Sequence, residues 1–151
     1  MGQARDYHAN PGDANGMNDV ARAWLLISKD NLESADILRK HGTPGASVDR
    51  AYFAMFDAAK AMSTAEGKDY PPCSKWLDAF GEAFVQTGRI DPTLFEDLRE
   101  AYRLRRVAVY GIKEEDRISR DVAESVFLKA TRFVGIAEDF IEKAGGELER
   151  S

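Results

Sequence analysis

The sequence has very few of the side chains that hold metals or form covalent cross-links. It contains one cysteine and two histidines among 151 residues. One cysteine cannot form an intrachain disulfide or a thiolate metal cage. His8 lies in a glycine-rich stretch and His41 at a predicted helix end, which argues against a histidine base deep in the fold. We therefore expect no metal and no cofactor.

The sequence also lacks the segments that direct a chain into or across a membrane. No run of about 18 apolar residues is present, and the N-terminus does not have the charged, apolar and small-residue order of a secretory signal. A GxxxxGK phosphate loop, a nucleophile elbow and paired metal-ligand motifs are missing as well. These absences predict a cytoplasmic protein without a membrane partner, and they argue against the enzyme classes that depend on those motifs.

The composition is that of one domain that folds on its own. Apolar residues make up 44% and charged residues 31% of the chain, which lies outside the range of disordered proteins. Lysine and arginine total 21 against 26 aspartate and glutamate, a formal net charge of -5. Because such a chain repels a phosphate backbone, any nucleic-acid role must depend on a local basic patch.

Helical periodicity and turn signals alternate along the chain, and no segment has the period-two pattern of a half-buried strand. We predict an all-α fold, an antiparallel up-and-down bundle of four to five helices. Residues 1–17 are expected to be a flexible leader, 18–146 the bundle and 147–151 a tail. The predicted helices run from an Asn18 cap to His41, from Pro44 to Gly67, from Lys75 to Thr87, from Pro92 to Tyr110, and from a Ser119 cap to Gly145 and Gly146.

The predicted helix boundaries rest on capping residues. Thr43 and Asp91 are each followed by proline, which is the order of an N-cap residue and a first helical residue. Glycines after the predicted ends, of which Gly42 is the first, supply the left-handed conformation at which helices stop. Short connections between such helices predict antiparallel neighbours.

Apolar residues at spacings of three and four define the faces that we expect to pack against one another. In the second predicted helix we interpret this stripe as core packing rather than as a ligand site. The predicted packing residues are Trp24, Leu25, Ile27, Ser28, Leu32, Ala35 and Leu38, then Tyr52, Met55, Phe56, Ala59 and Met62, then Trp76, Phe80 and Phe84, and finally Val122, Val126, Ala130, Phe133, Ala137 and Phe140.

One arginine interrupts the apolar face of the fourth predicted helix. That face, at spacings of four and three, consists of Leu94, Leu98, Ala101, Arg105 and Ala108. A buried, unpaired guanidinium costs several kcal/mol, and arginine cannot lose its proton. Arg105 must therefore find an acidic side chain, a partner chain or a ligand anion, or extend along the edge of the stripe to solvent. Asp57 is the intramolecular acidic partner that we consider.

A second group of basic residues lies on a neighbouring strip of the same predicted helix. The strip contains Arg99, Arg103 and Arg106, interleaved with Tyr102 and Tyr110. In proteins that bind single-stranded nucleic acids, arginines bind the phosphates and neighbouring tyrosines stack on the bases. Glutamate and aspartate side chains three or four residues away offer the other interpretation, which is an exposed face of ion pairs.

Three segments of the chain resemble the small stand-alone prokaryotic HEPN proteins, over about residues 19–144. They are the run AYFAMFDAA at 51–59, the helix 24–38 before it, and the segment from Arg105 to Tyr110 and Gly111. The resemblance implies an antiparallel bundle that forms a homodimer, with the arginine segments of two subunits lining a shared cleft. It also implies that relatives are RNA-cutting toxins or are encoded beside a minimal nucleotidyltransferase that acts as the antitoxin.

The catalytic motif of the ribonuclease members is only partly present. In those members an arginine is followed, after four to six residues, by a histidine. Counting from Arg105, Tyr110 stands in the first place open to that histidine, and Val109 stands where the most similar subgroup has aspartate. Tyrosine has an ordinary pKa of about 10 and is a poor general base at neutral pH. The partial motif favours a chain that binds and does not cleave; a cleaving chain would be a metal-independent ribonuclease.

Two functional hypotheses follow from these residues and from the resemblance. In the first, the chain is a component of a HEPN and minimal-nucleotidyltransferase pair of the toxin-antitoxin type. In the second, it is a non-catalytic helical module that binds a nucleotide, RNA or a partner protein; a purely structural adaptor is a third reading. The candidate catalytic residues are Arg105 and Tyr110, and the candidate ligand-binding residues are Asp57, Tyr102, Arg103, Arg105 and Arg106. Cys73, which follows two prolines, is interpreted as a small packing residue.

Overall fold

Helices alone make up the secondary structure of the described residues. The structure is a computed structural model and describes residues 14–68, 74–113, 115 and 117–150. Its elements are α1 (Ala14–His41), α2 (Pro44–Ala65), α3 (Ser74–Phe80), η2 (Gly81–Val85), α4 (Pro92–Tyr110) and α5 (Arg120–Arg150). The prediction of an all-α bundle is confirmed, since no strand occurs within these ranges.

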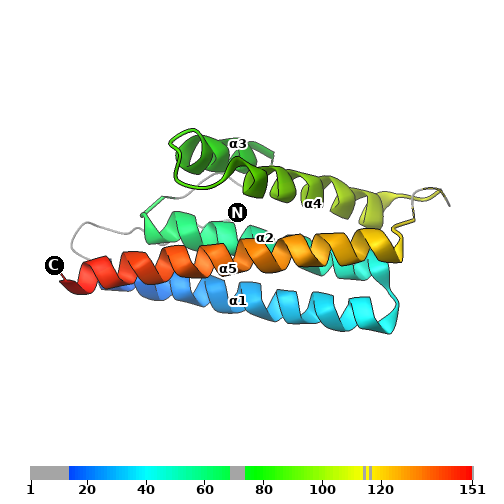
Figure 1. Cartoon of the computed structure of the whole chain (residues 1–151), viewed down its shortest axis with the longest axis horizontal. Coiled ribbons are helices and arrows are strands. Elements are labelled where there is room, and N and C mark those ends of the chain that lie inside the picture. The colour runs from blue at the N-terminus through cyan, green and yellow to red at the C-terminus, as the bar shows by residue number, and fades with distance from the viewer. Residues whose placement is uncertain (1–13, 69–73, 114, 116, 151) are drawn as a thin grey trace.

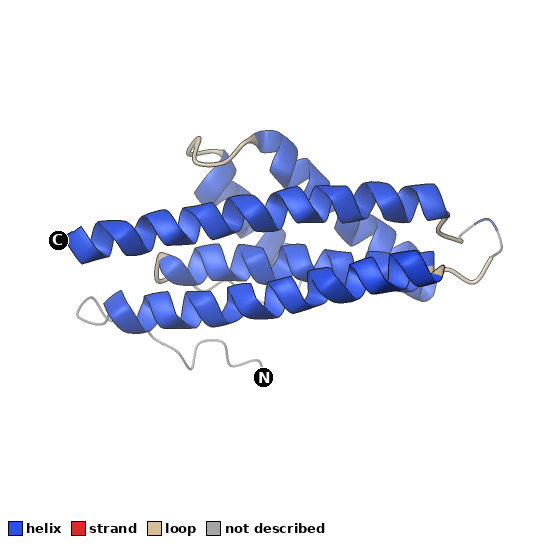
Figure 2. Ribbon diagram, turned by 60° about the horizontal axis from the view of Figure 1, so that its bottom comes forward, coloured by secondary structure: helices blue, strands red, loops and turns tan. Residues whose placement is uncertain are grey.

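Three long helices lie side by side and form the body of the bundle (Figure 1). The helices α1 and α2 form an antiparallel pair, and α5 packs against both of them. The helix α4 packs mainly on α2, and α3 with η2 lies near its N-terminal end (Figures 1 and 2). The turn between α1 and α2, the C-terminus of α4 and the start of α5 therefore gather at one end of the molecule.

Local signals end the first two helices and start α4 where the sequence predicts. Gly42 has a φ of 94° and Gly67 a φ of 69°, the left-handed conformation that follows many helices. Asp91 Oδ1 accepts a hydrogen bond from the Thr93 amide at 2.9 Å, which is a side-chain N-cap. These boundaries depend on interactions within a few residues, and this is why the sequence predicts them.

The Asn18 capping prediction is wrong, and the Thr43 prediction is confirmed in its position but not in its side-chain hydrogen bond. The helix α1 begins at Ala14, so Asn18 lies inside it rather than at its N-cap, and residues 14–17 are helical rather than part of a leader. Thr43 stands at the N-cap position of α2 but makes no side-chain cap. Its hydroxyl instead donates to the Leu38 carbonyl at 3.1 Å, because the two-residue connection keeps Thr43 beside the open carbonyls at the end of α1.

The helix α5 begins as predicted but ends later. Ser119 Oγ accepts a hydrogen bond from the Val122 amide at 3.1 Å and caps the helix. The helix then continues through Gly145 and Gly146 instead of stopping there. A Cβ at position 145 would lie 3.1 Å from Nη2 of Arg22 on α1. Gly145 thus lies beside side chains of α1, which is a tertiary contact that no local pattern reveals.

The third predicted helix is divided into α3 and the π-helix η2, whose hydrogen bonds close a wider turn. The division coincides with Gly81, where the Phe95 ring of α4 approaches the backbone so closely that an added Cβ would lie 2.9 Å from it. Trp76, Phe80 and Phe84 are buried, as predicted. The short segment therefore joins the core although its helix is irregular.

The stripes predicted from apolar spacing form one core. Ile27 and Leu38 are not part of it; Ile27 is 45% exposed, and the buried Ala21 and Leu25 occupy the core side of α1. Phe56 lies at the edge of the core and is partly buried. Among the predicted packing residues, the fully buried ones include Ser28, Ala35, Met55, Ala59, Phe80, Phe84, Ala130 and Ala137.

Some predicted features lie outside the described residues. They are the N-terminal segment 1–13 with His8, and the proline-containing connector 69–73 with Cys73. Across the part of the chain that is described, no helix has both the length and the apolar character that a membrane crossing requires.

Candidate functional site

Arg105 lies on the side of α4 that packs against α2. Its Nε donates to Asp49 Oδ1 at 2.9 Å, and its side chain is 24% exposed. The sequence predicts that this guanidinium finds an acidic partner, but the choice of Asp57 as that partner is wrong. Because α2 and α4 run antiparallel, the last turns of α4 lie opposite the first turns of α2, which brings Asp49 to Arg105.

Two aromatic rings of α2 lie next to the Arg105 guanidinium. Its Cζ is 5.0 Å from the centroid of the Phe53 ring and 6.0 Å from that of Tyr52. The negative face of an aromatic ring attracts a cation at such distances. Burial raises the pKa of Tyr52 to about 12. Tyr52 therefore remains a neutral hydroxyl and cannot act as a base near neutral pH.

Arg50 shares the Asp49 carboxylate with Arg105. Its Nη2 donates to Asp49 Oδ2 at 3.0 Å, and its Nη1 donates to Asn31 Oδ1 at 3.2 Å. Its Cζ is 5.2 Å from the centroid of the Phe53 ring. We name Asp49, Arg50, Phe53 and Arg105 the two-arginine cluster. The cluster carries one more positive charge than its single carboxylate neutralises.

Asp57 lies on the side of α2 that faces α1. Its Oδ2 accepts a hydrogen bond from Asn31 Nδ2 at 2.9 Å, and the residue is 6% exposed. Burial raises the pKa of Asp57 to about 6, against the Asn31 hydrogen bond and the charges of Lys60 and Arg50. Asn31 therefore connects this buried carboxyl to the two-arginine cluster through Arg50.

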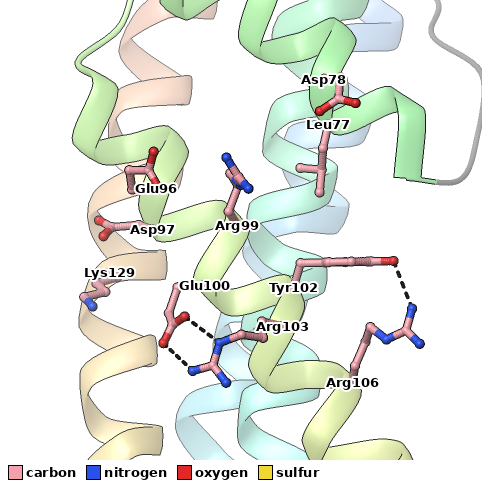
Figure 3. A pocket seen from close by; sticks show the side chains of 10 residues that line it. All are labelled: Leu77, Asp78, Glu96, Asp97, Arg99, Glu100, Tyr102, Arg103, Arg106 and Lys129. Atoms are coloured by element: carbon pink, nitrogen blue, oxygen red, sulfur yellow. Dashed lines mark hydrogen bonds and ion pairs between the residues drawn. The ribbon is translucent and has the colours of Figure 1, made fainter.

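Three other candidate residues border a cleft on the outer side of α4. Tyr102, Arg103 and Arg106 line a cavity of about 760 Å³ next to α3 and α5 (Figure 3). The rest of the lining consists of Leu77, Asp78, Glu96, Asp97, Arg99, Glu100 and Lys129. Four cationic side chains and four carboxylates thus border this cavity. Its lining has no excess of positive charge, so it does not favour a polyanion.

The basic strip beside this cleft includes a face of ion pairs. Arg103 donates from Nε and Nη2 to the two oxygens of Glu100, at 2.9 and 2.7 Å. Arg106 Nη1 donates to Tyr102 Oη at 3.5 Å, a long contact that Figure 3 also shows. Exposed pairs three residues apart contribute only a few tenths of a kcal/mol. For Arg103 the ion-pair interpretation of the sequence is therefore the one that the contacts favour.

Tyr110 lies at the exposed end of α4 and does not face the same way as Arg105. Five positions along an α-helix correspond to a rotation of about 140°. Tyr110 is 65% exposed, and the nearby apolar side chains of Val109 and Ile112 are 46% and 94% exposed. Within one subunit, the arginine and the tyrosine of the partial motif therefore point into different spaces.

The structure separates the predicted site residues. Arg105 belongs to the two-arginine cluster, Asp57 lies between α1 and α2, Tyr110 ends α4, and Tyr102, Arg103 and Arg106 line the cleft. Asp49, Arg50 and Phe53 are not among the site residues that the sequence predicts. The signal that was available is the adjacent pair of opposite charges at 49 and 50, directly before the apolar stripe of α2.

The two-arginine cluster offers hydrogen-bond donors and positive charge. Guanidinium groups remain protonated at all relevant pH values, and they bind carboxylate or phosphate through two parallel hydrogen bonds. Within the described ranges, no group of three or more His, Cys, Asp or Glu side chains is placed to hold a metal ion. The cluster is therefore suited to an anionic group of a ligand.

Comparisons with known proteins give consistent results. Residues 21–144 match the model of the HEPN domain. A protein of Methanocaldococcus jannaschii with the name "Putative toxin" is 31% identical over 132 residues, which are 87% of this chain and 93% of that protein. A "UPF0332 protein" of Thermotoga maritima is 26% identical over 128 residues, 85% of this chain and 96% of its own length. A second "Putative toxin" of M. jannaschii is 28% identical, with 74% of each chain covered.

Proposed function

The chain belongs to the HEPN domain family, and on this premise we propose that it is the HEPN component of a toxin-antitoxin-type pair whose other member is a minimal nucleotidyltransferase. The name "Putative toxin" of two relatives supports the toxin part of this proposal. The nucleotidyltransferase part rests on the resemblance to HEPN proteins that are encoded beside such an enzyme. We place the function in the cytoplasm, where RNA is accessible.

RNA is the ligand that we propose for Arg105. One observation carries this proposal: within the described residues, the hydrogen bond to Asp49 uses Nε of Arg105, and no hydrogen bond is formed by Nη1 or Nη2. With its side chain 24% exposed, the guanidinium has donors left for the phosphate group of a strand. The net charge of -5 makes such a local cationic site necessary for RNA binding.

A second candidate function is an RNA-binding module that does not cleave its ligand. The observation that favours it is the place of Tyr110, which stands where ribonuclease members have a histidine and is 65% exposed at the end of α4. Tyrosine lacks the imidazole with which a histidine takes up and releases a proton near neutral pH. In this version the partial motif retains the phosphate contact of Arg105 and loses the proton transfer.

Binding of a fluorescein-labelled single-stranded RNA, followed by fluorescence anisotropy at low salt, tests the role of Arg105. We expect Arg105→Ala to weaken binding about tenfold, because a charge-assisted hydrogen bond to phosphate is lost. Arg132→Ala is the matched control, since Arg132 lies 46% exposed on α5 and contacts Asp91 and Thr93 at the other end of α4. Equal affinities of the wild type and of Arg105→Ala would exclude Arg105 from the RNA site.

The same RNA, resolved on a denaturing gel after hours of incubation, separates the two candidate functions. Shortening by the wild type but not by Arg105→Ala supports a ribonuclease. An RNA that is bound and stays intact supports the module without cleavage. Shortening that is equal with both proteins indicates a contaminating nuclease and contradicts the first candidate.

Expression in a bacterial host tests the proposed pairing. We expect the chain alone to slow growth, and expect co-expression with a nucleotidyltransferase encoded beside its gene to restore growth. The control is the same nucleotidyltransferase with its active site inactivated. Absence of a neighbouring nucleotidyltransferase gene, together with normal growth during expression of the chain, would contradict the toxin-antitoxin proposal.

We also propose that the chain forms a homodimer through the end of α4. Val109, Tyr110 and Ile112 present exposed apolar surface close together in the sequence, which supports a protein contact at this place. Light scattering is expected to give twice the mass of one chain for the wild type, and Ile112→Glu is expected to give the mass of one chain. A wild type that is monomeric at micromolar concentration would contradict this prediction.

A further inference from the structure

The two arginines of the two-arginine cluster are held by the same carboxylate. Arg105 Nε uses Oδ1 of Asp49 at 2.9 Å, and Arg50 Nη2 uses Oδ2 at 3.0 Å. A single negative charge therefore lies between two positive charges. Because one carboxylate neutralises only one guanidinium, the cluster retains the charge needed to attract a further anion.

The two guanidinium groups are also held by the same aromatic ring. Their Cζ atoms lie 5.2 Å (Arg50) and 5.0 Å (Arg105) from the centroid of the Phe53 ring. Long side chains that are already fixed lose less conformational entropy when they bind a ligand. The ring and the carboxylate together therefore prepare both arginines for binding.

Each arginine keeps donors that its contacts with the described residues do not use. Arg105 has Nη1 and Nη2, since the hydrogen bond to Asp49 uses Nε. Arg50 has Nε, since its two Nη atoms donate to Asn31 and Asp49. The side chains are 24% and 39% exposed, respectively. Solvent, and therefore a ligand, has access to both.

We infer that Arg50 and Arg105 act together as a two-guanidinium site for one phosphate group of RNA. This inference rests on the proposed function and deepens it, because it assigns a second binding residue to the site of Arg105. Arginine is suited to this role since its planar donors match the oxygens of phosphate. Asp49 is the positioning residue, which orients both arginines and lowers the net charge of the site.

Anisotropy of the labelled RNA measures the contribution of each residue. We expect Arg50→Ala to weaken binding about tenfold, as Arg105→Ala does, and the double variant to weaken it by less than the product of the two effects, because both groups hold one phosphate. We expect Asp49→Asn to tighten binding several-fold, because the competing negative charge is removed while the asparagine oxygen still accepts a hydrogen bond from one of the two arginines. A merely structural Asp49 would give no tightening.

Two controls keep the outcome interpretable. Arg132→Ala should bind RNA as the wild type does, and Arg50→Lys should recover part of the affinity because it restores the charge without the planar donors. Arg50→Lys and Asp49→Asn also carry the test if Arg50→Ala does not fold. AMP as a competitor distinguishes two sources of the bound phosphate. Displacement of the labelled RNA by AMP indicates a site that also takes a free nucleotide, and displacement by unlabelled RNA but not by AMP indicates a site that takes only a strand. Each result supports the phosphate site.

The results also separate this inference from the proposed function. Loss of affinity with Arg105→Ala, but unchanged affinity with Arg50→Ala and with Asp49→Asn, would overturn the two-arginine site and leave RNA binding by Arg105 intact. Unchanged affinity with every one of these variants would overturn both. Fully multiplicative effects of Arg50→Ala and Arg105→Ala would place the two arginines on separate phosphates and would also contradict the inference.

Discussion

Replacement of Phe80 by alanine is expected to lower the free energy of unfolding by about 4 kcal/mol. The Phe80 side chain is fully buried. Its ring centroid lies 4.8 Å from that of Phe84, 5.9 Å from Trp76 and 6.4 Å from Phe133. Truncation removes apolar burial and leaves a cavity that rigid aromatic neighbours cannot fill, and such Phe→Ala changes cost about 3 to 5 kcal/mol.

Urea titration followed by circular dichroism measures this effect. Phe80 connects the irregular segment α3 and η2 to Phe133 of α5, so its loss should lower the midpoint of the whole transition rather than of one helix. Leu128→Ala is the control, since Leu128 is 58% exposed and its truncation should cost less than about 0.5 kcal/mol. Equal midpoints for the two variants would show that α3 and η2 contribute little to the core.

Replacement of Asp57 by asparagine is expected to stabilise the protein at pH 7.5 by about 3 kcal/mol. Burial raises the pKa of Asp57 from its ordinary 3.8 to about 6, and each pKa unit corresponds to about 1.4 kcal/mol. The ionised carboxylate is thus disfavoured in the folded state. An asparagine amide oxygen can still accept the hydrogen bond from Asn31 Nδ2, and it carries no charge to bury.

The sign of the pH dependence follows from proton uptake. Between about pH 4 and pH 6 the folded chain holds a proton on Asp57 that the unfolded chain releases, so the contribution of Asp57 to stability falls as the pH rises through this window. Above pH 6 the full cost is present. The advantage of Asp57→Asn should therefore be near zero at pH 4 and largest at pH 7.5.

Urea titrations of the wild type and of Asp57→Asn at both pH values measure the difference. Asp30→Asn, which removes the same charge from an exposed position of α1, should change stability by less than about 0.5 kcal/mol at either pH. Reduced stability of Asp57→Asn at pH 7.5 would mean that Asn31, Lys60 and Arg50 stabilise the buried carboxylate by more than its burial costs.

Much of the fold could be predicted because it depends on neighbours in the sequence. The side chains of Asp91 and Ser119 cap helices by accepting hydrogen bonds from amides two or three residues ahead. Gly42 ends α1 through its own positive φ, which requires no other residue. Prediction from the sequence fails where packing against another helix determines whether a residue is buried or where a helix ends. Gly145 lies inside α5 beside side chains of α1, and Ile27 is exposed while Ala21 and Leu25 are buried on the core side of α1.

The candidate site likewise has one part that sequence neighbours determine and another that packing between helices determines. The sequence identifies Arg105 because a charge interrupts an apolar face, and that reasoning requires only the period of one helix. It does not identify Asp49, 56 residues away in the chain, because the order and direction of helices decide which acid meets which arginine.

By itself, the sequence determined the all-α class, most helix ends, the core stripes, the resemblance to HEPN proteins and the demand of Arg105 for a counter-charge. These are properties of short segments, since capping and apolar periodicity act over a few residues. Only the tertiary structure decided that Asp49 supplies the counter-charge of Arg105, that Arg50 and Phe53 lie beside them, and that Tyr110 points away from Arg105. The reason is that antiparallel packing of α2 on α4 brings together residues from opposite ends of two helices, and neither helix encodes that register alone.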